Sequence, residues 1–119
     1  MAEVFFFDQE GQPLPKDEVR IEELRAEVYP DRERIKVSIT LTPFLDRPNL
    51  SMGVRNLFGE MVASSEVLEV MSVRSEVTLH LRGSQVQDEH IVRVDLYYEG
   101  LDTIDSKETR VGETSELSE

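Results

Sequence analysis

Apolar and polar side chains alternate along most of this chain. Residues 35–42 give the clearest example and read Ile-Lys-Val-Ser-Ile-Thr-Leu-Thr. A period of two is typical of a β-strand with one face in a core and the other in water. Residues 75–81 and 92–98 repeat the pattern, and the second places Tyr97 on the outer face and Tyr98 on the core face. The chain is therefore predicted to be all-β.

Residues typical of turns separate these segments. Residues 29–33 and 56–59 contain proline, aspartate, asparagine or glycine between apolar runs, and Gly83 and Gly100 follow later strands. Such residues mark reversals because they fix φ or tolerate a positive φ. About seven to eight short strands with regularly spaced turns are typical of an antiparallel β-sandwich.

The two ends of the chain complete this prediction. Residues 4–7 form a short apolar run that we expect to be a strand, and residues 103–111 predict a charged edge strand. A single sandwich domain is expected over residues 1–111. Residues 112–119 are polar and acidic, and we expect them to form a disordered tail.

Two segments allow a second interpretation. Residues 17–26 suit a short helix, but a strand with a bulge near Glu22 and Glu23 fits the apolar spacing and leads into the hairpin at 29–33. Residues 60–71 also suit a helical stripe, whereas their valines favour strands. The strand interpretation places these residues on one face: Met61, Ala63, Val67, Met71 and Val73.

The charge of the chain limits the classes of partner that it is expected to bind. The 119 residues include 25 acids and 13 bases, for a net charge of −12. This charge disfavours nucleic acid and anionic membranes. Residues 1–34 carry −5 and residues 88–119 carry −7, whereas residues 35–87 are neutral. The acidic ends predict either a face that attracts a basic partner or charged edge strands that resist pairing.

The chain contains no cysteine, so disulfides and thiolate zinc sites are excluded. Its first residues lack the basic region of a signal peptide, and no apolar run reaches the roughly 20 residues of a membrane span. We therefore expect a cytoplasmic location.

Two acidic clusters are candidates for a metal ion. Asp88, Glu89 and His90 would serve a metal-dependent enzyme, although a solvated loop explains the same sequence. Asp102 and Asp105 flank a turn and would bind calcium only with many more oxygen ligands. Neither cluster has the defined spacing of known metal motifs, so no metal is expected.

Catalysis is not predicted. His80 lies between Leu79 and Leu81, two expected core residues, so we expect it to face water. No Gly-x-Ser-x-Gly motif occurs, and nothing in the sequence pairs a serine with a histidine and an acid. We expect a non-enzymatic protein without a cofactor.

The strand count, chain length and hairpin order resemble the immunoglobulin-like or fibronectin type III-like sandwich over residues 19–111. The chain lacks the cysteine pair and core tryptophan of antibody domains. Residues 49–62, Asn-Leu-Ser-Met-Gly-Val-Arg-Asn-Leu-Phe-Gly-Glu-Met-Val, resemble a hairpin of the glycan-recognising C-terminal domain of O-antigen ABC transporter ATPases. This resemblance implies carbohydrate binding.

Four aromatic residues are candidates for an interaction site. Tyr29, Phe58 and Tyr97 are expected to be exposed, and aromatic faces stack on sugars or anchor interfaces. Phe6 lies in a Phe-Phe-Phe run, whose strand either is covered on both faces or contacts another subunit. The predicted function is a non-catalytic protein-interaction or accessory module, with a basic protein or a second copy as partner. The alternative is a carbohydrate-binding domain with a glycan ligand.

Overall fold

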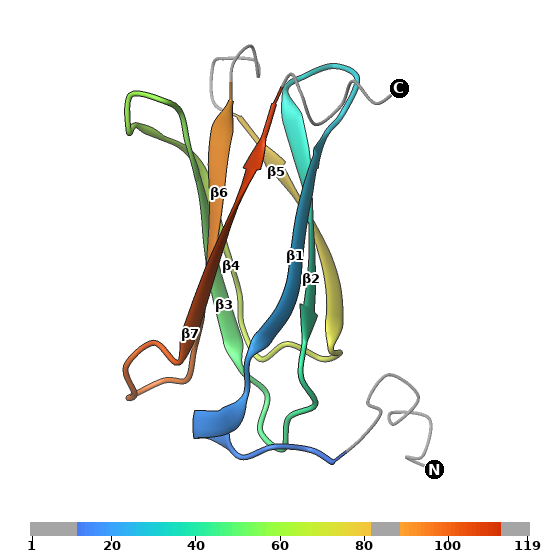
Figure 1. The fold of residues 1–119 in the computed structure, drawn as a ribbon, viewed down its shortest axis with the longest axis vertical. Helices are drawn as coiled ribbons and strands as arrows, with labels where there is room; N and C mark the ends of the chain where they lie inside the picture. The colour runs from blue at the N-terminus through green and yellow to red at the C-terminus, as the bar shows by residue number, and fades with distance from the viewer. Residues whose placement is uncertain (1–11, 82–88, 113–119) are drawn as a thin grey trace.

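The computed structural model of this chain describes residues 12–81 and 89–112. Seven β-strands form two antiparallel sheets in this part of the chain (Figure 1). The strands are β1 (Ile21–Val28), β2 (Arg34–Leu41), β3 (Asn49–Arg55), β4 (Met61–Val67), β5 (Arg74–His80), β6 (His90–Tyr97) and β7 (Asp105–Val111). A short 3-10 helix, η2 (Lys16–Glu18), precedes β1.

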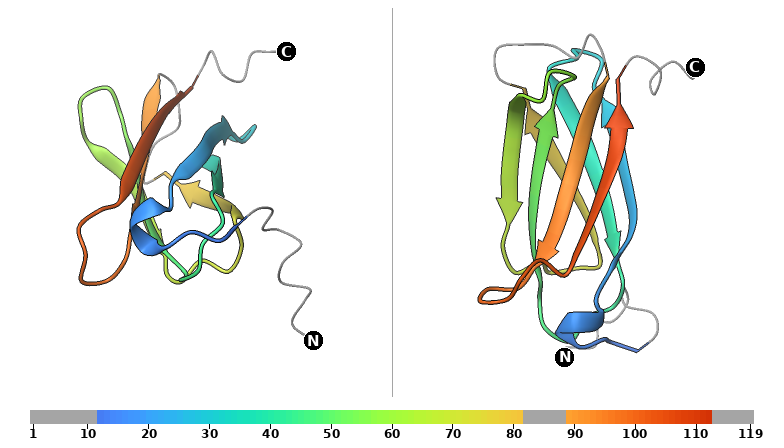
Figure 2. Two further views of the ribbon diagram at one scale, coloured as in Figure 1. Left: turned by 60° about the horizontal axis from the view of Figure 1, so that its bottom comes forward. Right: turned by 60° about the vertical axis from the view of Figure 1, so that its left-hand side comes forward.

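One sheet has the order β1–β2–β5 and the other β4–β3–β6–β7. The two sheets face each other as the layers of a sandwich (Figure 2). The expected antiparallel β-sandwich is confirmed, and the resemblance to immunoglobulin-like domains holds at the level of the fold. In constant-type immunoglobulin domains the fourth strand pairs with the fifth. Here β4 pairs with β3 instead.

The core lies between the sheets, where the alternating pattern predicted it. β2 buries every second residue from Ile35 to Leu41, and β6 does so from Val92 to Leu96. Complete burial of a Val, Leu or Ile side chain stabilises a fold by about 1.5–3 kcal/mol. Tyr98 continues the core face of β6 and is 4% exposed.

The first segment with two interpretations, residues 17–26, leads into a strand and not a helix of that length. β1 pairs with β2, and the register shifts between Ile21 and Glu23. This irregularity confirms the bulge expected near Glu22 and Glu23, and the helix alternative for residues 17–26 is wrong. The charged residues that favour a helix also suit an edge strand, and β1 lies at the edge of its sheet.

The second segment with two interpretations, residues 60–71, is a strand followed by a loop. β4 confirms the strand interpretation up to Val67, but the chain then leaves the sheet. The expectation that Met71 and Val73 share a face is wrong, because Met71 is 75% exposed and Val73 is buried. Glu69 ends the strand with a left-handed φ of 51°.

The described residues include the C-terminal end of the predicted domain but not residues 1–11. β7 is an edge strand with four charged residues, as predicted. The expected strand at 4–7 and nearly all of the expected tail at 112–119 lie outside the described residues, so the domain limits stay a prediction. In the part of the chain that is described, no helix is long and apolar enough to cross a membrane.

Candidate functional site

Exposed apolar side chains mark the two ends of the sandwich. The lower end in Figure 1 carries the loops β2–β3, β4–β5 and β6–β7, and the upper end carries the β1–β2 and β3–β4 hairpins. Among the described residues, the exposed large hydrophobic side chains at the lower end are Leu45, Leu68, Met71 and Leu101, and those at the upper end are Leu57, Phe58 and Met61. Concentrated exposure of this kind marks interaction sites.

The loops of the lower end surround a groove of about 730 Å³. We call it the lower-end groove. It is lined by Lys16, Leu45, Asp46, Arg47, Asn49, Leu68, Glu69, Tyr97, Tyr98 and Glu99. Leu45 and Leu68 are each 65% exposed and form apolar parts of its lining.

Hydrogen bonds fix the loops that form this groove. The Tyr98 hydroxyl donates to the backbone carbonyl of Asp46 at 2.8 Å, which ties β6 to the β2–β3 loop. The buried Asn49 side chain accepts from the backbone N–H of Glu69 at 2.8 Å. That bond holds the left-handed backbone of Glu69, a conformation that costs energy outside glycine and persists only when its surroundings support it. The lower-end groove is therefore preorganised.

Both tyrosines of the groove are neutral hydrogen-bonding groups at physiological pH. Burial, with a smaller contribution from Asp46, raises the pKa of Tyr98 to about 12. Burial and the hydrogen bond from its hydroxyl to Glu66 raise the pKa of Tyr97. The Lys16 ammonium lies 5.5 Å from the centre of the Tyr98 ring, within the range of a cation–π contact.

The structure does not bring the predicted aromatic residues together. Tyr97 lies at the lower end of β6, in the groove, whereas Phe58 lies in the β3–β4 turn at the upper end. Tyr29 is at the upper end of the other sheet, next to β1. Phe6 lies outside the described residues. Of the three predicted residues that the structure describes, Tyr97 alone lines the groove.

Tyr29 is occupied by its own surroundings. The Arg34 guanidinium lies 4.2 Å from the centre of the ring, and the hydroxyl is 3.2 Å from that of Thr78. The first contact lies within the β1–β2 hairpin, and the second joins the hairpin to β5. We conclude that Tyr29 supports the hairpin, and its ring face is partly covered for stacking on a ligand.

Phe58 is held outward by a rigid turn. The Asn56 side-chain oxygen accepts the backbone N–H groups of Phe58 and Glu60, both at 2.9 Å. Gly59 takes a positive φ of 85°, which glycine adopts without strain. The Phe58 side chain is 87% exposed as a result, and the turn predicted at 56–59 is confirmed.

Met61 fills a notch on the outer face of the four-stranded sheet. Gly53 lies in the middle of β3, and a Cβ atom at this position would be 2.7 Å from the Met61 sulfur. The register explains the approach, because Ala63 pairs with Val54 whereas Met61 pairs with Arg55, so β4 has one extra residue. A shallow cavity of about 190 Å³ lies beside this contact.

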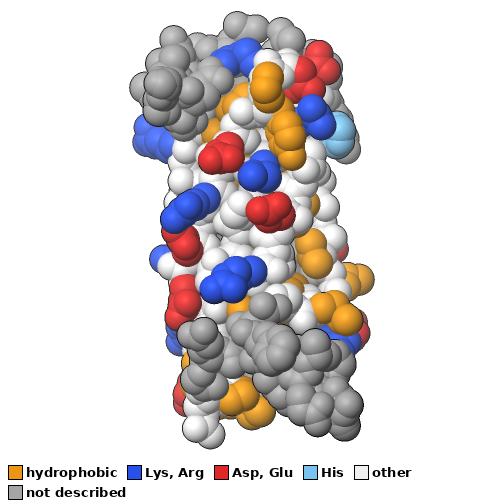
Figure 3. Space-filling view, turned by 90° about the vertical axis from the view of Figure 1, so that its right-hand side faces the viewer, with side chains coloured by type: hydrophobic (Ala, Val, Ile, Leu, Met, Phe, Trp, Pro, Cys, Tyr) orange, Lys and Arg blue, Asp and Glu red, His pale blue; other side chains and the backbone are white. Residues whose placement is uncertain are grey.

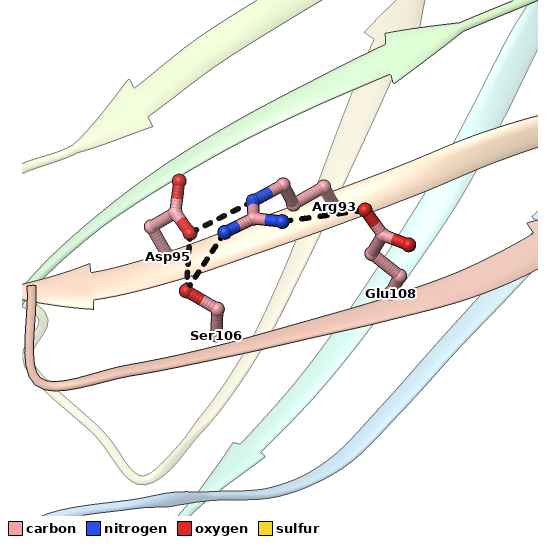
Figure 4. Close-up of polar contacts among 4 residues, drawn as sticks. All are labelled: Arg93, Asp95, Ser106 and Glu108. Atoms are coloured by element: carbon pink, nitrogen blue, oxygen red, sulfur yellow. Dashed lines mark hydrogen bonds and ion pairs between the residues drawn. The ribbon is translucent and has the colours of Figure 1, made fainter.

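The remainder of that outer face carries a network of charged side chains. Arg93 binds Asp95 at 3.1 Å and Glu108 at 3.3 Å, and its third nitrogen donates to the Ser106 hydroxyl (Figure 4). Ser106 in turn donates to Asp95. Asp95 and Glu108 raise the pKa of Arg93. Because Arg93 is 51% exposed, we expect a small energetic contribution from each pair.

The outer face of the three-stranded sheet is also charged, with acidic and basic side chains interspersed (Figure 3). Arg25 pairs with Glu23 at 2.7 Å, and Lys36 pairs with Glu27 at 3.7 Å. Pairs of this kind keep a surface hydrated and solvated. Among the described residues, β1, β2 and β5 carry none of the exposed large hydrophobic side chains.

Among the described residues, neither candidate metal cluster forms a site. The Glu89 carboxylate pairs with Arg110 at 3.0 Å. His90 is only 5% exposed at the start of β6, so the solvated-loop interpretation of this residue is wrong. Asp88 lies outside the described residues. Within residues 12–81 and 89–112, no group of three or more acidic or histidine side chains could hold a metal ion.

Two further candidate site residues, Asp105 and His80, lie outside the lower-end groove. Asp105 accepts the backbone N–H of Ile21 at 2.9 Å and so joins β7 to β1 across the sandwich. This structural bond uses the carboxylate that a calcium site with Asp102 would need. His80 is exposed, as predicted.

Sequence reasoning did not find the lower-end groove. Its lining comes from η2, three loops, the start of β3 and the end of β6, which are distant in the sequence. One signal was present for Leu45, which lies between Pro43 and Asp46 in the break that separates two predicted strands. An apolar residue in a turn has no core strand to join, so it is a candidate for an exposed contact.

Comparison with known proteins places the fold but not the family. No protein-family model matches the chain, and no curated protein matches it. Solved structures with a similar fold include a glycosyl hydrolase family 2 member from Bacteroides cellulosilyticus (16% identity, 79% of this chain, TM-score 0.59). They also include a family 76 glycoside hydrolase from Bacteroides thetaiotaomicron (15%, 77%, 0.62) and a β-glucuronidase from Parabacteroides merdae (14%, 80%, 0.61).

These similarities concern one part of much larger proteins. The chain covers 15%, 20% and 14% of the three solved structures, respectively. At such low identity the likeness shows the fold alone. The chain therefore shares a β-sandwich with a portion of each glycoside hydrolase.

Proposed function

We propose that this chain is a non-catalytic interaction module that binds a partner protein at the lower-end groove. The observation that supports it most is the combination of two exposed leucines, Leu45 and Leu68, with loops that hydrogen bonds already hold in place. Apolar anchors within a polar rim are typical of the energetic centre of an interface. Preorganised loops reduce the entropy lost on binding.

The charge of the module supports a basic partner. Of the 25 acids and 13 bases, 18 acids and 12 bases fall within the described residues, which therefore carry a net charge of −6. Asp46, Glu69 and Glu99 line the lower-end groove against two bases. A basic partner would associate faster at low salt, because an acidic surface steers it over distances of about 10 Å.

Affinity capture with matched variants tests this proposal. The full chain, Leu45→Ser and Leu101→Ser would be immobilised and exposed to lysate of the source cells at low and high salt. We expect one stoichiometric protein that the wild type and Leu101→Ser retain and that Leu45→Ser loses. Leu101 is 51% exposed on the β6–β7 turn and does not line the groove, so it controls for the loss of any exposed leucine.

Two results would contradict the proposal. Recovery of the same proteins by Leu45→Ser and the wild type would exclude the groove as the binding site. Recovery that is unaffected by salt would exclude the basic partner while leaving an apolar contact in place.

A glycan ligand is the second candidate, because Tyr97 lies in the same groove as Asn49 and Arg47. A tyrosine ring beside amide and guanidinium groups suits a polar, ring-shaped ligand. Two further observations support it: the similar solved structures are glycoside hydrolases, and β3 with β4 forms the hairpin that resembles the glycan-recognising domain of O-antigen ABC transporter ATPases.

Titration with oligosaccharides tests the glycan candidate. We expect amide chemical-shift changes confined to the groove in the wild type, their loss in Tyr97→Ala and their retention in Tyr29→Ala. Tyr29 is a matched control because it lies at the opposite end of the molecule. Absence of shifts across a broad panel of neutral and acidic glycans would remove this candidate.

A further inference from the structure

The four edge strands of the sandwich differ sharply in charge. β1 carries four charged residues among eight, β7 carries four among seven, and β5 carries Arg74, Glu76 and the exposed His80. β4, with the sequence Met-Val-Ala-Ser-Ser-Glu-Val, carries Glu66 alone. Soluble proteins protect their edge strands with charge, proline or bulges, because unpaired backbone groups recruit other strands. The edge of β4 has one charge and the extra residue next to Met61.

Apolar side chains flank the same strand at both of its ends. Leu57, Phe58 and Met61 lie before or at its start, and Leu68 and Met71 follow it. Five of the seven exposed large hydrophobic residues in the described part of the chain are therefore within four residues of β4. No strand among the described residues pairs with its outer edge.

We propose that the outer edge of β4 pairs antiparallel with β4 of a second copy of this chain. This inference goes beyond the proposed function, because it names a second surface, the outer edge of β4, and its partner. Two copies related by a two-fold axis present the same strand to each other, so each contact occurs twice. The two four-stranded sheets would then continue into one sheet across the contact.

The arrangement of the apolar residues fits this partner. β4 runs from the upper end of the sandwich to the lower end, so an antiparallel copy runs the opposite way. The upper group of one copy, which includes Phe58 and Met61, then meets the lower group of the other, which includes Leu68 and Met71. A parallel arrangement would instead place each group against itself and could not close on a two-fold axis.

The charges also fit a second copy. Residues 35–87, which contain β3, β4 and β5, carry five acids and five bases. Pairing centred on Ser64 places Glu66 opposite Val62, and pairing centred on Ser65 places it opposite Ser64. In neither register do like charges face each other across the strands, so the destabilisation that such pairs cause is avoided. The strongly acidic segments lie outside β3, β4 and β5.

Sedimentation equilibrium of the full chain over about 1 μM to 1 mM tests the proposal. We expect wild-type masses that approach twice the 13.7 kDa of one chain. Phe58→Glu and Met71→Glu should each weaken the dimer by about tenfold or more, because each places two charges in the contact. Leu101→Glu should leave the dimer unchanged, since Leu101 lies on the turn between β6 and β7. Circular dichroism verifies that the variants are folded.

Cross-linking provides a measurement that does not depend on those variants. The chain has no cysteine, so one introduced cysteine reports one position. We expect a disulfide-linked dimer to form rapidly with Ser64→Cys or Ser65→Cys and slowly with Lys107→Cys on the opposite edge strand. Equal rates at all three positions would overturn the proposal. A monomer at every concentration would also overturn it. That result would leave the proposed function standing, because affinity capture with Leu45→Ser tests the binding of a different protein.

Discussion

The two long sides of the sandwich differ in the contacts between the two sheets and in the charge of their edge strands. On one side, β1 and β7 come together from different sheets, and the Asp105 carboxylate accepts the Ile21 N–H across them. On the other side, β4 and β5 make fewer mutual contacts, and the β4 edge carries a single charge between two groups of exposed apolar residues. The first side is built for stability and is protected by charge. The second has one charge on the β4 edge and exposed apolar residues before and after this strand.

This difference separates residues that hold the monomer together from exposed residues that do not. An apolar residue that is exposed contributes little to the stability of the monomer, and it costs solubility. Under the proposals above, such residues act in a contact outside the monomer. Mutations on the two sides should therefore affect different measurements.

The largest effect on stability is expected at Ile21, on the β1–β7 side. Ile21 is 2% exposed, and Ile21→Ala should lower the free energy of unfolding by about 2–5 kcal/mol, because a cavity replaces packed side chain. On the other side, Leu68→Ala removes a similar volume from a side chain that is 65% exposed. It should change stability by no more than about 0.5 kcal/mol. Urea unfolding of both variants measures the contrast, and equal losses would contradict it.

A smaller effect is expected from the bond between the sheets. Asp105→Ala leaves the partly buried Ile21 N–H without its acceptor, at a cost of about 1–3 kcal/mol. Asp105→Asn keeps an oxygen in place and should lose less. Urea denaturation compares the two. If Asp105→Ala were as stable as the wild type, solvent would be replacing the carboxylate and the β1–β7 side would not depend on it.

Alkaline pH should weaken the lower end through Tyr98. Its pKa is about 12 in the folded chain against an ordinary value of 10.0, so folding favours the neutral phenol. That contribution is fully present below pH 10 and is lost as the pH rises from 10 toward 12. Tyr98→Phe should be less stable at neutral pH by about 0.5–1.5 kcal/mol but should decline less steeply. Unfolding midpoints from pH 9 to 12 measure both slopes, with Tyr29→Phe at the opposite end of the molecule as the matched control. Parallel slopes for wild type and Tyr98→Phe would contradict this assignment.

The smallest effect is expected in the charged network of β6 and β7. Glu108 is 53% exposed and pairs with Arg93 at 3.3 Å. Glu108→Gln should change stability by about 0.5 kcal/mol or less, and this difference should disappear at about 1 M salt because exposed pairs are screened. A thermal melt at low and high salt measures it. A loss above 1 kcal/mol would mean that the network stabilises the fold as well as protecting the edge.

The parts of the fold that were predictable follow from local pattern. The alternation at 35–42 identified β2 because a strand between core and water imposes a period of two on its own sequence. The same pattern placed Tyr98 in the core and Tyr97 outside. The charged composition of residues 103–111 indicated an edge for a physical reason, since charge resists pairing with other chains.

The remaining parts depend on residues far apart in the sequence. The strand at 61–67 ends where Glu69 turns, and its turn is held by Asn49, 20 positions earlier. The Tyr98 hydroxyl finds its acceptor 52 positions away. No local pattern encodes either partner, so the loop at 68–73 and the lower-end groove could be recognised only after the sheets were assembled.

The four charged residues of β7 have a consequence for how far this protein can assemble. A contact on a two-fold axis uses β4 of both copies. Neither copy then has a free β4 edge for a third subunit. The sheet that results would end on both sides in β7, whose charges repel a further strand. Growth would stop at two subunits, which separates a defined dimer from the open-ended stacking that leads to fibrils.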